Sequence, residues 1–455
     1  MENIPRLKAA FRRAYPDAPE PVVCRAPGRI NLLGEHVDYN GLPVLPMTID
    51  RDICVACAPR NDHRVRLSDR EPPFPPAEFV NGPDIAPSPA GSWENYCKAA
   101  FQGLNRHFGV ENPPGLDIRV SGDVPIAAGL SSSSALVVAC ALACLKALDK
   151  SLGPDISRIE LATLLADAEQ YVGTRGGGMD QAIILLGEEG DACKIDFHPL
   201  RAEKVPVFDE YVFVACNSLV KAEKTGAALT RYNEGPLSCR LIRALVEKQA
   251  QTEFGDEIEL AHLADLWYGP LCLTNAEVAS LFDAAFEKDT TTLEEAAAAL
   301  DMAPQAIRDA WIGELPEPEG GFPLRARARH QLTEFKRVDA ARDLALTGDA
   351  IGFGRLMNES HASCAQDYAV SCPELDELVA IARRAGSIGS RLTGAGFGGC
   401  TVNLVPAKDV DRFRATVERQ YYRTYLPAHR IPCDESTLES SILLVRPTPG
   451  AGYLS

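Results

Sequence analysis

The chain has 455 residues, enough for two or three domains of ordinary size around a large hydrophobic core. Lys and Arg number 46 and Asp and Glu number 63, which gives a formal charge of −17. Nucleic acids and anionic membranes attract basic surfaces, so this balance argues against both as partners. No apolar stretch approaches the length of a transmembrane helix. Residues 1–17 lack the apolar core of a signal peptide and predict an amphipathic surface helix, so we expect a cytoplasmic protein.

The fourteen cysteines are scattered along the chain and do not form the dense framework of a small secreted protein. We therefore expect buried free thiols in a reducing compartment. Cys54 and Cys57 are closely spaced, but strand residues three apart point to opposite faces, which argues against a shared metal or a disulfide.

The first half of the chain mixes strands with helices. Apolar runs that end near Gly or Pro predict strands at 22–28, 53–59, 115–123, 192–197 and 210–218. Ala- and Leu-rich runs predict helices at 133–150 and 160–172. A regular βαβ repeat is missing, so we expect the α+β class.

The second half is dominated by helical periodicity from about Thr225. It predicts helices at 239–251, 275–288, 292–301 and 329–348, and strands at 399–407 and 441–447. Pro-rich loops are expected at 72–76 and 314–323. The change in texture predicts a boundary near residue 200 and two domains, 1–200 and 201–455.

The segment Pro125–Val138 is a loop of small residues that runs directly into a long apolar helix. Free N–H groups and the helix dipole at such a terminus favour an anion such as a nucleotide phosphate. Its serine hydroxyls could bind phosphate or Mg²⁺. A serine-rich helix cap without a ligand is the alternative, and the segment is not a Walker A loop.

The segment Arg25–Gly41 places polar side chains between Gly and Pro turns. They are Arg29, Asn31, Glu35, His36, Asp38 and Tyr39. Carboxylates and an imidazole can accept hydrogen bonds from sugar hydroxyls, and an arginine can stabilise a transferring phosphoryl group. A polar surface turn with local ion pairs is the alternative.

Two further glycine-rich segments follow. Gly176–Gly178 would let the backbone approach a ligand closely, and Asp180 just after them could orient or deprotonate a hydroxyl. A turn with an aspartate cap is the alternative. Residues 391–401 form another glycine loop before a strand. An anion site, a polyol site and a carboxylate together indicate phosphoryl transfer from a nucleotide to a hydroxyl.

These segments resemble the GHMP kinase superfamily. Residues 28–39 resemble the galactokinase signature, residues 129–134 the phosphate loop, and residues 392–400 the third superfamily motif. The resemblance extends from about residue 20 to the end of the chain. It implies a two-domain GHMP kinase fold with the active site in the interdomain cleft. It also implies ATP-dependent phosphorylation of the C1 hydroxyl of galactose.

The resemblance implies a role for individual residues. Asp180 would be the catalytic carboxylate, as a base or as an electrostatic positioner, with Arg29 beside it and both in contact with the sugar. Further sugar contacts would come from Glu35, His36, Asp38, Gly177 and Tyr232. ATP phosphates would lie against Gly129, Leu130, Ser131, Ser132, Ser133 and Ser134. Ser133 would contact Mg²⁺, and Trp93 would line the adenine pocket.

The chain departs from the family next to one of these residues. Galactokinases commonly carry a Tyr-Asn-x-Arg run before a cysteine. Here Tyr232 keeps its spacing to Cys239, but Gly235 stands at the arginine position. The following Pro236 predicts a helix that begins only after this point.

The function has three candidate assignments, two of which differ in the sugar that is phosphorylated. Several segments, among them 129–137, 176–181 and 390–396, resemble an N-acetylgalactosamine kinase branch, and Gly103 could leave room for a 2-acetamido group. We expect galactose as the main substrate, N-acetylgalactosamine as the alternative, and a non-catalytic galactose- and ATP-binding regulator as a further alternative. Such regulators lack part of the serine loop, which is complete here. The expected partners are the sugar and ATP, and the expected state is a monomer.

Overall fold

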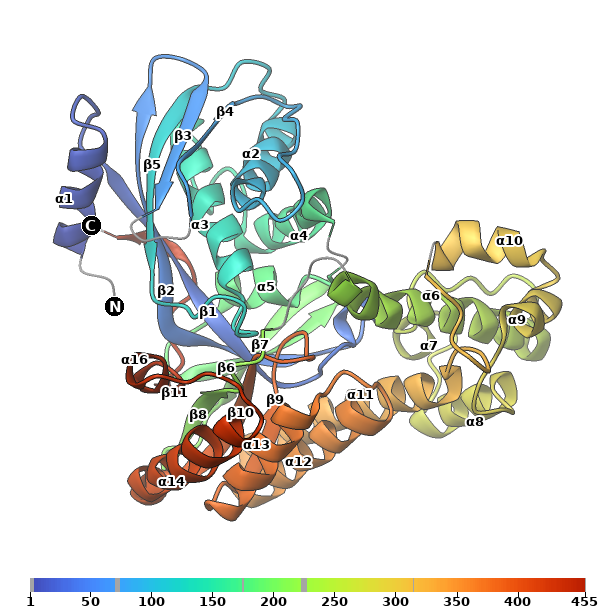
Figure 1. Ribbon diagram of the computed structural model, residues 1–455. Helices are drawn as coiled ribbons and strands as arrows, with labels where there is room; N and C mark the ends of the chain where they lie inside the picture. The colour runs from blue at the N-terminus through green and yellow to red at the C-terminus, as the bar shows by residue number, and fades with distance from the viewer. Residues whose placement is uncertain (1–3, 70–73, 174–175, 222–226, 314, 455) are drawn as a thin grey trace.

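The computed structural model (Figure 1) describes residues 4–69, 74–173, 176–221, 227–313 and 315–454, with 227–232 described as backbone alone. The described strands form one six-stranded, one four-stranded and one two-stranded sheet. Of the described strands, only β3 and β5 pair in parallel. Helices and largely antiparallel sheets in one chain confirm the predicted α+β class.

The six-stranded sheet has the strand order β12-β1-β2-β5-β3-β4. Its strands are β1 (Val22–Leu33), β2 (Leu45–Arg60), β3 (Arg64–Asp69), β4 (Ala77–Val80), β5 (Gly115–Gly122) and β12 (Gly452–Leu454). β12 pairs antiparallel with β1, so the last described residues complete a sheet whose other strands all precede residue 123. Arg25 also donates a 2.8 Å hydrogen bond to the carbonyl of Pro449.

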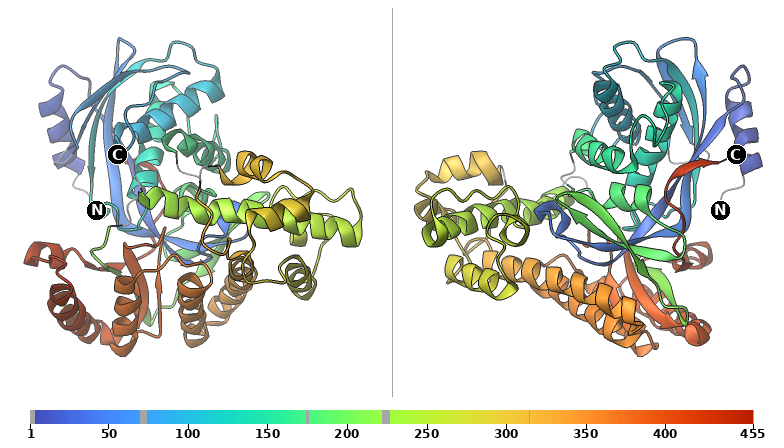
Figure 2. Two further views of the ribbon diagram at one scale, coloured as in Figure 1. Left: turned by 45° about the vertical axis from the view of Figure 1, so that its right-hand side comes forward. Right: turned by 180° about the vertical axis from the view of Figure 1, so that it is seen from behind.

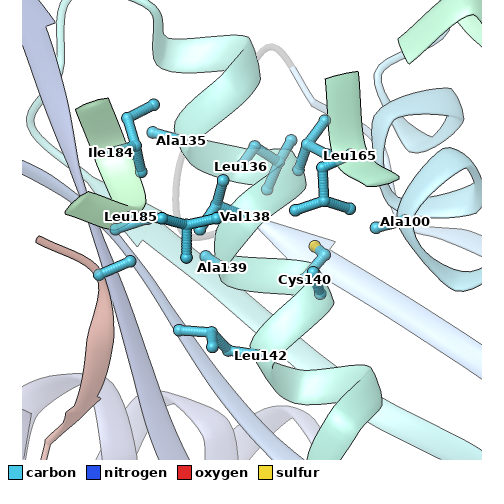
Figure 3. Close-up of a cluster of buried hydrophobic side chains, with 14 of the residues drawn as sticks. Ala100, Ala135, Leu136, Val138, Ala139, Cys140, Leu142, Leu165, Ile184 and Leu185 are labelled. Atoms are coloured by element: carbon cyan, nitrogen blue, oxygen red, sulfur yellow. The ribbon is translucent and has the colours of Figure 1, made fainter. Parts of the chain in front are cut away.

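Helices cover both faces of this sheet. The helices α2 (Glu94–Phe108), α3 (Ser132–Ala147), α4 (Arg158–Ala168) and α5 (Met179–Leu186) lie on one face, and α1 (Ile4–Ala14) lies on the other (Figure 1). α3 is apolar on every side, as a helix buried on all sides must be. Figure 3 shows Val138 and Leu142 of α3 in one cluster with Leu165 of α4 and Leu185 of α5.

The four-stranded sheet has the order β11-β8-β10-β9. Its strands are β8 (Tyr211–Asn217), β9 (Gly389–Leu392), β10 (Cys400–Pro406) and β11 (Ile442–Val445). Phe213 and Ala215 pack with the cluster of β1, β2 and α12 (Ala350–Gln366). Val214 and Cys216 pack with that of α13 (Pro373–Arg384) and α14 (Val410–Val417). Burial of both faces explains why β8 reads as a continuous apolar run.

The middle of the chain forms a helical extension. Its helices are α6 (Ala227–Phe254), α7 (Asp265–Tyr268), α8 (Asn275–Ala285), α9 (Leu293–Leu300), α10 (Pro304–Ile307) and α11 (Leu324–Thr347). Figure 2 shows α6 to α10 extending away from both large sheets.

The two-stranded sheet is β6 (Asp191–Phe197) with β7 (Leu200–Pro206). Short segments complete the chain: η1 (Asp38–Asn40), η2 (Glu169–Val172), η3 (Arg308–Ile312), η4 (Ala407–Asp409), η5 (Glu418–Tyr425), α15 (Leu426–Ala428) and α16 (Glu435–Glu439).

The expectation that Pro236 delays the start of a helix is wrong. α6 begins at Ala227 and carries Pro236 in its interior. Gly235 and Pro236 are both buried, and Gly235 leaves room for Tyr368, whose Oη would lie 2.7 Å from an added Cβ. Tertiary packing of this turn therefore offsets the hydrogen bond that the proline removes.

The cysteines behave as predicted. All fourteen are free and most are buried. Cys54 packs with Phe11 of α1, whereas Cys57 packs with the α3 side of the sheet, so the two thiols do lie on opposite faces of β2. Within the described ranges, no helix combines the length and the apolarity needed to cross a membrane.

Candidate active site

The centre of the site is an ion pair between Arg29 and Asp180. β1 carries Arg29, and the first turn of α5 carries Asp180. Arg29 Nε lies 2.7 Å from Asp180 Oδ1 and Nη2 lies 3.1 Å from Oδ2, the two-point geometry that fixes a carboxylate most firmly. Nη1 donates to the carbonyl of Gly129 at 2.5 Å. Arg29 therefore joins the predicted catalytic carboxylate to the predicted phosphate loop.

The serine loop completes this junction. Gly129 and Ser131 both have left-handed backbone angles, with φ of 76° and 59°, which turn the chain into α3. Ser131 Oγ donates to Asp180 Oδ2, and Ser134 Oγ lies 3.4 Å from the same oxygen and 2.8 Å from Glu169 Oε1. Ser132 and Ser133 are partly exposed at the first turn of α3, where the helix dipole favours an anion.

The carbonyl of Leu130 belongs to the same junction. It accepts a 3.1 Å hydrogen bond from the backbone N–H of Arg29, while the Leu130 side chain is buried. The loop and the strand that carries Arg29 are therefore tied through their backbones as well as through side chains.

The glycine-rich segment 391–401 packs against the backbone of the serine loop. An added Cβ at Gly394 would lie 2.5 Å from the carbonyl oxygen of Gly129, and one at Gly399 would lie 2.9 Å from Ala128. The N–H of Cys400 donates to Ala128 at 2.9 Å. These glycines permit a backbone-to-backbone approach that no larger residue allows.

The predicted sugar motif, Arg25–Gly41, is largely buried and is not an exposed surface turn. Glu35 accepts from Arg391 Nη2 at 3.0 Å and from the N–H of Gly394 at 3.1 Å. His36 has a φ of 58°, and its Nε2 lies 3.1 Å from the carbonyl of Ala395. Asp38 Oδ2 accepts from the N–H of Met179 at 3.3 Å, which brings it to the start of the helix that carries Asp180.

Gly177 brings the segment Gly176–Gly178 into direct contact with the segment Arg25–Gly41. An added Cβ would lie 2.2 Å from Tyr39 N, 2.3 Å from Asp38 C and 2.5 Å from Asp38 Cγ. Two of these three atoms belong to the backbone, so a side chain at position 177 fits only if the backbone moves. The glycine run predicted to approach a ligand closely thus approaches the sugar motif itself.

Burial sets the protonation of the site. It raises the pKa of Glu35 to about 7, against the opposing effect of Arg391 and Arg29. Burial, with the charge of Asp180, raises the pKa of Asp38 to about 6. Burial also opposes the charge of Arg29, but Asp180 keeps its pKa above the ordinary value. Two of the predicted sugar contacts therefore titrate close to neutrality.

A cavity of about 600 Å³ lies beside Asp38 and Gly177, between the first and second halves of the chain. Its lining includes Asp167 from the end of α4, Gln170 from η2, and Pro236 and Arg240 from α6. The predicted sugar motif thus borders a cavity that residues from both halves of the chain line.

The remaining predicted residues lie in different places. Trp93 is buried against Phe74 and donates to the carbonyl of Pro75 at 3.0 Å. Tyr232 falls in α6, but its side chain lies outside the described residues. Gly103 does not line the cavity. It packs α2 against α4, where an added Cβ would lie 3.2 Å from Ala168.

Sequence reasoning missed two residues of the site. Glu169, from η2, accepts from Ser134 in the phosphate loop. Arg391 is fully buried and pairs with Glu35. Arg391 is the first residue of the glycine-rich segment 391–401, which is a signal that could have found it, whereas nothing in the local sequence marks Glu169.

Comparisons with known proteins agree with this geometry. The chain matches the galactokinase galactose-binding signature over residues 9–59, the GHMP kinases N terminal domain over 95–188 and the GHMP kinases C terminal model over 340–423. It is 33% identical to a galactokinase of Dictyostelium discoideum, covering 99% of this chain and 93% of that protein. It is 36% identical to one of Roseiflexus sp. (strain RS-1), covering 93% of each.

A crystal structure of Lactococcus lactis galactokinase complexed with galactose has a TM-score of 0.77 at 29% identity, covering 99% of this chain and 100% of that one. A mevalonate kinase structure shares the fold at a TM-score of 0.53 and 18% identity. The predicted GHMP kinase fold is thereby confirmed. Similarity at this level along nearly the whole length shows that the chain belongs to the galactokinase family of the GHMP kinases.

Proposed function

We propose that this protein transfers the terminal phosphoryl group of ATP to the C1 hydroxyl of galactose and releases galactose 1-phosphate and ADP. The observation that carries the proposal is the contact of Asp180 with both Arg29 and the serine loop, directly after Met179, whose N–H donates to Asp38. A hydroxyl bound at this junction would face both a carboxylate and the helix terminus that suits the ATP phosphates. Relatives at 33% and 36% identity carry the name galactokinase.

Asp180 is better suited to orient the C1 hydroxyl than to remove its proton early. Both carboxylate oxygens accept from Arg29, and Oδ2 also accepts from Ser131. Such bonds hold the carboxylate in one orientation. In the transfer, the C1 oxygen forms a bond to the γ-phosphorus while the bond to the ADP oxygen breaks. The hydroxyl donates a hydrogen bond to Asp180 Oδ2, and its proton passes to this oxygen as the bond between the C1 oxygen and the γ-phosphorus forms.

The sugar contacts are assigned to the buried motif. Glu35, His36, Asp38 and the backbone of Gly177 would hold the remaining hydroxyls, together with Tyr232 from α6. The cavity that both halves enclose begins at Asp38 and Gly177, which supports this placement.

ATP is assigned to the serine loop. Backbone N–H groups from Gly129 to Ser134 would hold its phosphates, and Trp93 would border the adenine. Mg²⁺ prefers hard oxygen ligands, and the hydroxyl of Ser133 with the carboxylate of Glu169 near Ser134 fits that preference. When bound, the ion would neutralise charge on the phosphates. Ser133 is proposed as its contact from the protein.

Galactose is favoured over N-acetylgalactosamine. The acetamido argument rested on Gly103, which packs against Ala168 and Leu164 of α4 and does not border the cavity. The regulator alternative is disfavoured because the serine loop, Arg29 and Asp180 are all present and joined. The direct test measures ATP consumption with galactose, N-acetylgalactosamine, glucose and no sugar. Faster turnover with galactose is expected. Binding of galactose without turnover would instead support a regulator.

Three assignments stay predictions. They are a monomeric state, which light scattering after size exclusion would check, a reducing cytoplasm as the place of action, and a domain division near residue 200. Limited proteolysis that cuts first near residue 200 is the expected result for the division.

A further inference from the structure

One face of α11 carries three buried polar side chains that the proposed reaction does not use. His330, Gln331 and Glu334 are each 0% exposed. All three point toward the turn that holds Glu35 and His36. Buried polar side chains almost always form hydrogen bonds, so their partners indicate which segment this face of α11 stabilises.

Glu334 binds the beginning of the turn. Its Oε1 accepts from the N–H of Gly34 at 2.8 Å and from the N–H of Glu35 at 3.3 Å. Ser360 donates to the same oxygen at 2.6 Å, and Arg337 Nε lies 2.7 Å from Oε2. Burial alone would raise the pKa of Glu334, but Arg337 and Arg391 hold it at about 2. Glu334 is therefore an anion throughout the neutral range.

His330 and Gln331 bind the next two carbonyls. His330 Nε2 lies 2.9 Å from the carbonyl of Glu35, and its Nδ1 lies 2.9 Å from Ser363 Oγ. Burial lowers the pKa of His330, so the ring is neutral, and the carbonyl acceptor requires the proton on Nε2. Gln331 Nε2 donates to the carbonyl of His36 at 3.0 Å, while its Oε1 accepts from Asn40 Nδ2 at 2.8 Å.

These bonds hold consecutive backbone groups of a strained turn. His36 has a φ of 58°, a left-handed conformation that costs energy for a residue with a side chain. The surroundings must impose it, and α11 binds the backbone on both sides of its Cα. The side chains of Glu35 and His36 leave the turn in directions set by that backbone.

We propose that His330, Gln331 and Glu334 are positioning residues for sugar recognition, acting through the backbone of Gly34–His36. The inference rests on the proposed function, because it requires that this turn binds the sugar. A residue that fixes the turn sets affinity for the sugar and leaves the ATP site unchanged, since the hydrogen bonds of these three side chains go to the turn and to neighbouring helices and not to the serine loop.

The test compares His330→Leu with His330→Gln. Leucine removes the donor to the Glu35 carbonyl, whereas the amide of glutamine can replace it. We expect the leucine variant to raise the KM for galactose about two- to tenfold, as the loss of one hydrogen bond implies, with the KM for ATP and kcat near wild type. The glutamine variant should recover most of the galactose affinity. Gln331→Leu should resemble His330→Leu.

Lys336→Gln on the exposed side of the same helix is the matched control and should change neither KM. Calorimetric binding of galactose to the same variants separates affinity from turnover. Equal rises in both KM values, or a galactose affinity that His330→Leu and Gln331→Leu leave unchanged, would overturn the proposal. If His330→Leu does not fold, Gln331→Leu takes its place in the comparison, and the reverse. A wild-type protein that neither binds nor phosphorylates galactose would refute the proposed function itself.

Discussion

The contact of Gly177 with the sugar motif makes a sharp prediction for Gly177→Ala. The new Cβ would lie 2.2 Å from Tyr39 N and 2.3 Å from Asp38 C. Ordinary contacts between such atoms begin near 3.4 Å, so the two segments must separate by roughly 1 Å. The movement cannot be absorbed by a side chain, because both nearest atoms belong to the backbone.

The expected cost follows from what the loop positions. Asp180 lies three residues after Gly177, and Met179 donates to Asp38. A misplacement of about 1 Å at a catalytic group lowers activity by on the order of 10²-fold. We therefore expect kcat/KM for galactose to fall roughly 10- to 100-fold. ATP affinity should stay within about twofold of wild type, because the serine loop packs on Gly394 and Gly399 instead.

Gly176→Ala is the matched control. It lies one residue away in the same loop, and an added Cβ there meets nothing within 4 Å. The assay is sugar-dependent ATP consumption over a range of galactose concentrations, with thermal melting to confirm folding. A Gly177→Ala enzyme of wild-type efficiency, or a Gly176→Ala enzyme equally impaired, would refute the reasoning.

Three further outcomes are expected. Asp180→Asn should lower turnover by on the order of 10²- to 10⁴-fold with nucleotide affinity nearly unchanged, and wild-type turnover would contradict its role. Ser133→Ala should raise the Mg²⁺ concentration at half-maximal rate, whereas an unchanged titration would place the ion elsewhere. Galactose affinity should increase from about pH 5.5 to about pH 7.5, because Asp38 and Glu35, with pKa values of about 6 and about 7, accept hydroxyl protons best when ionised. Calorimetry should detect proton release on binding below pH 7, and a flat affinity profile would count against both assignments.

Local sequence patterns predicted part of the secondary structure, but not the helices α12, α13 and α14. The long apolar run became α3, buried on every side, and the continuous apolar run at 210–218 became β8, buried on both faces. Short edge strands such as β4 and β12 were not predicted, because a few residues carry no periodicity. The proline at 236 misled the prediction, since packing of Gly235 on Tyr368 outweighed the local signal.

The site was predictable where motifs are continuous in sequence. Arg29 and Asp180 come from glycine-rich segments that were recognisable separately, although 151 residues separate them. Arg391 and Glu334 contact Glu35 or its turn across separations of 356 and 300 residues. Only the fold brings such residues together, and a buried arginine or glutamate looks like any surface charge in a single sequence.

The pairing of β12 with β1 has a consequence for synthesis on the ribosome. β1 emerges early and carries Arg29, yet one of its edges is covered only by residues near 450. Until those residues emerge, that edge presents free N–H and C=O groups that another nascent chain could pair with. The strand that carries Arg29 is thus among the last to gain its full complement of neighbours. Activity should therefore arise only after the residues of β12 have emerged and paired with β1.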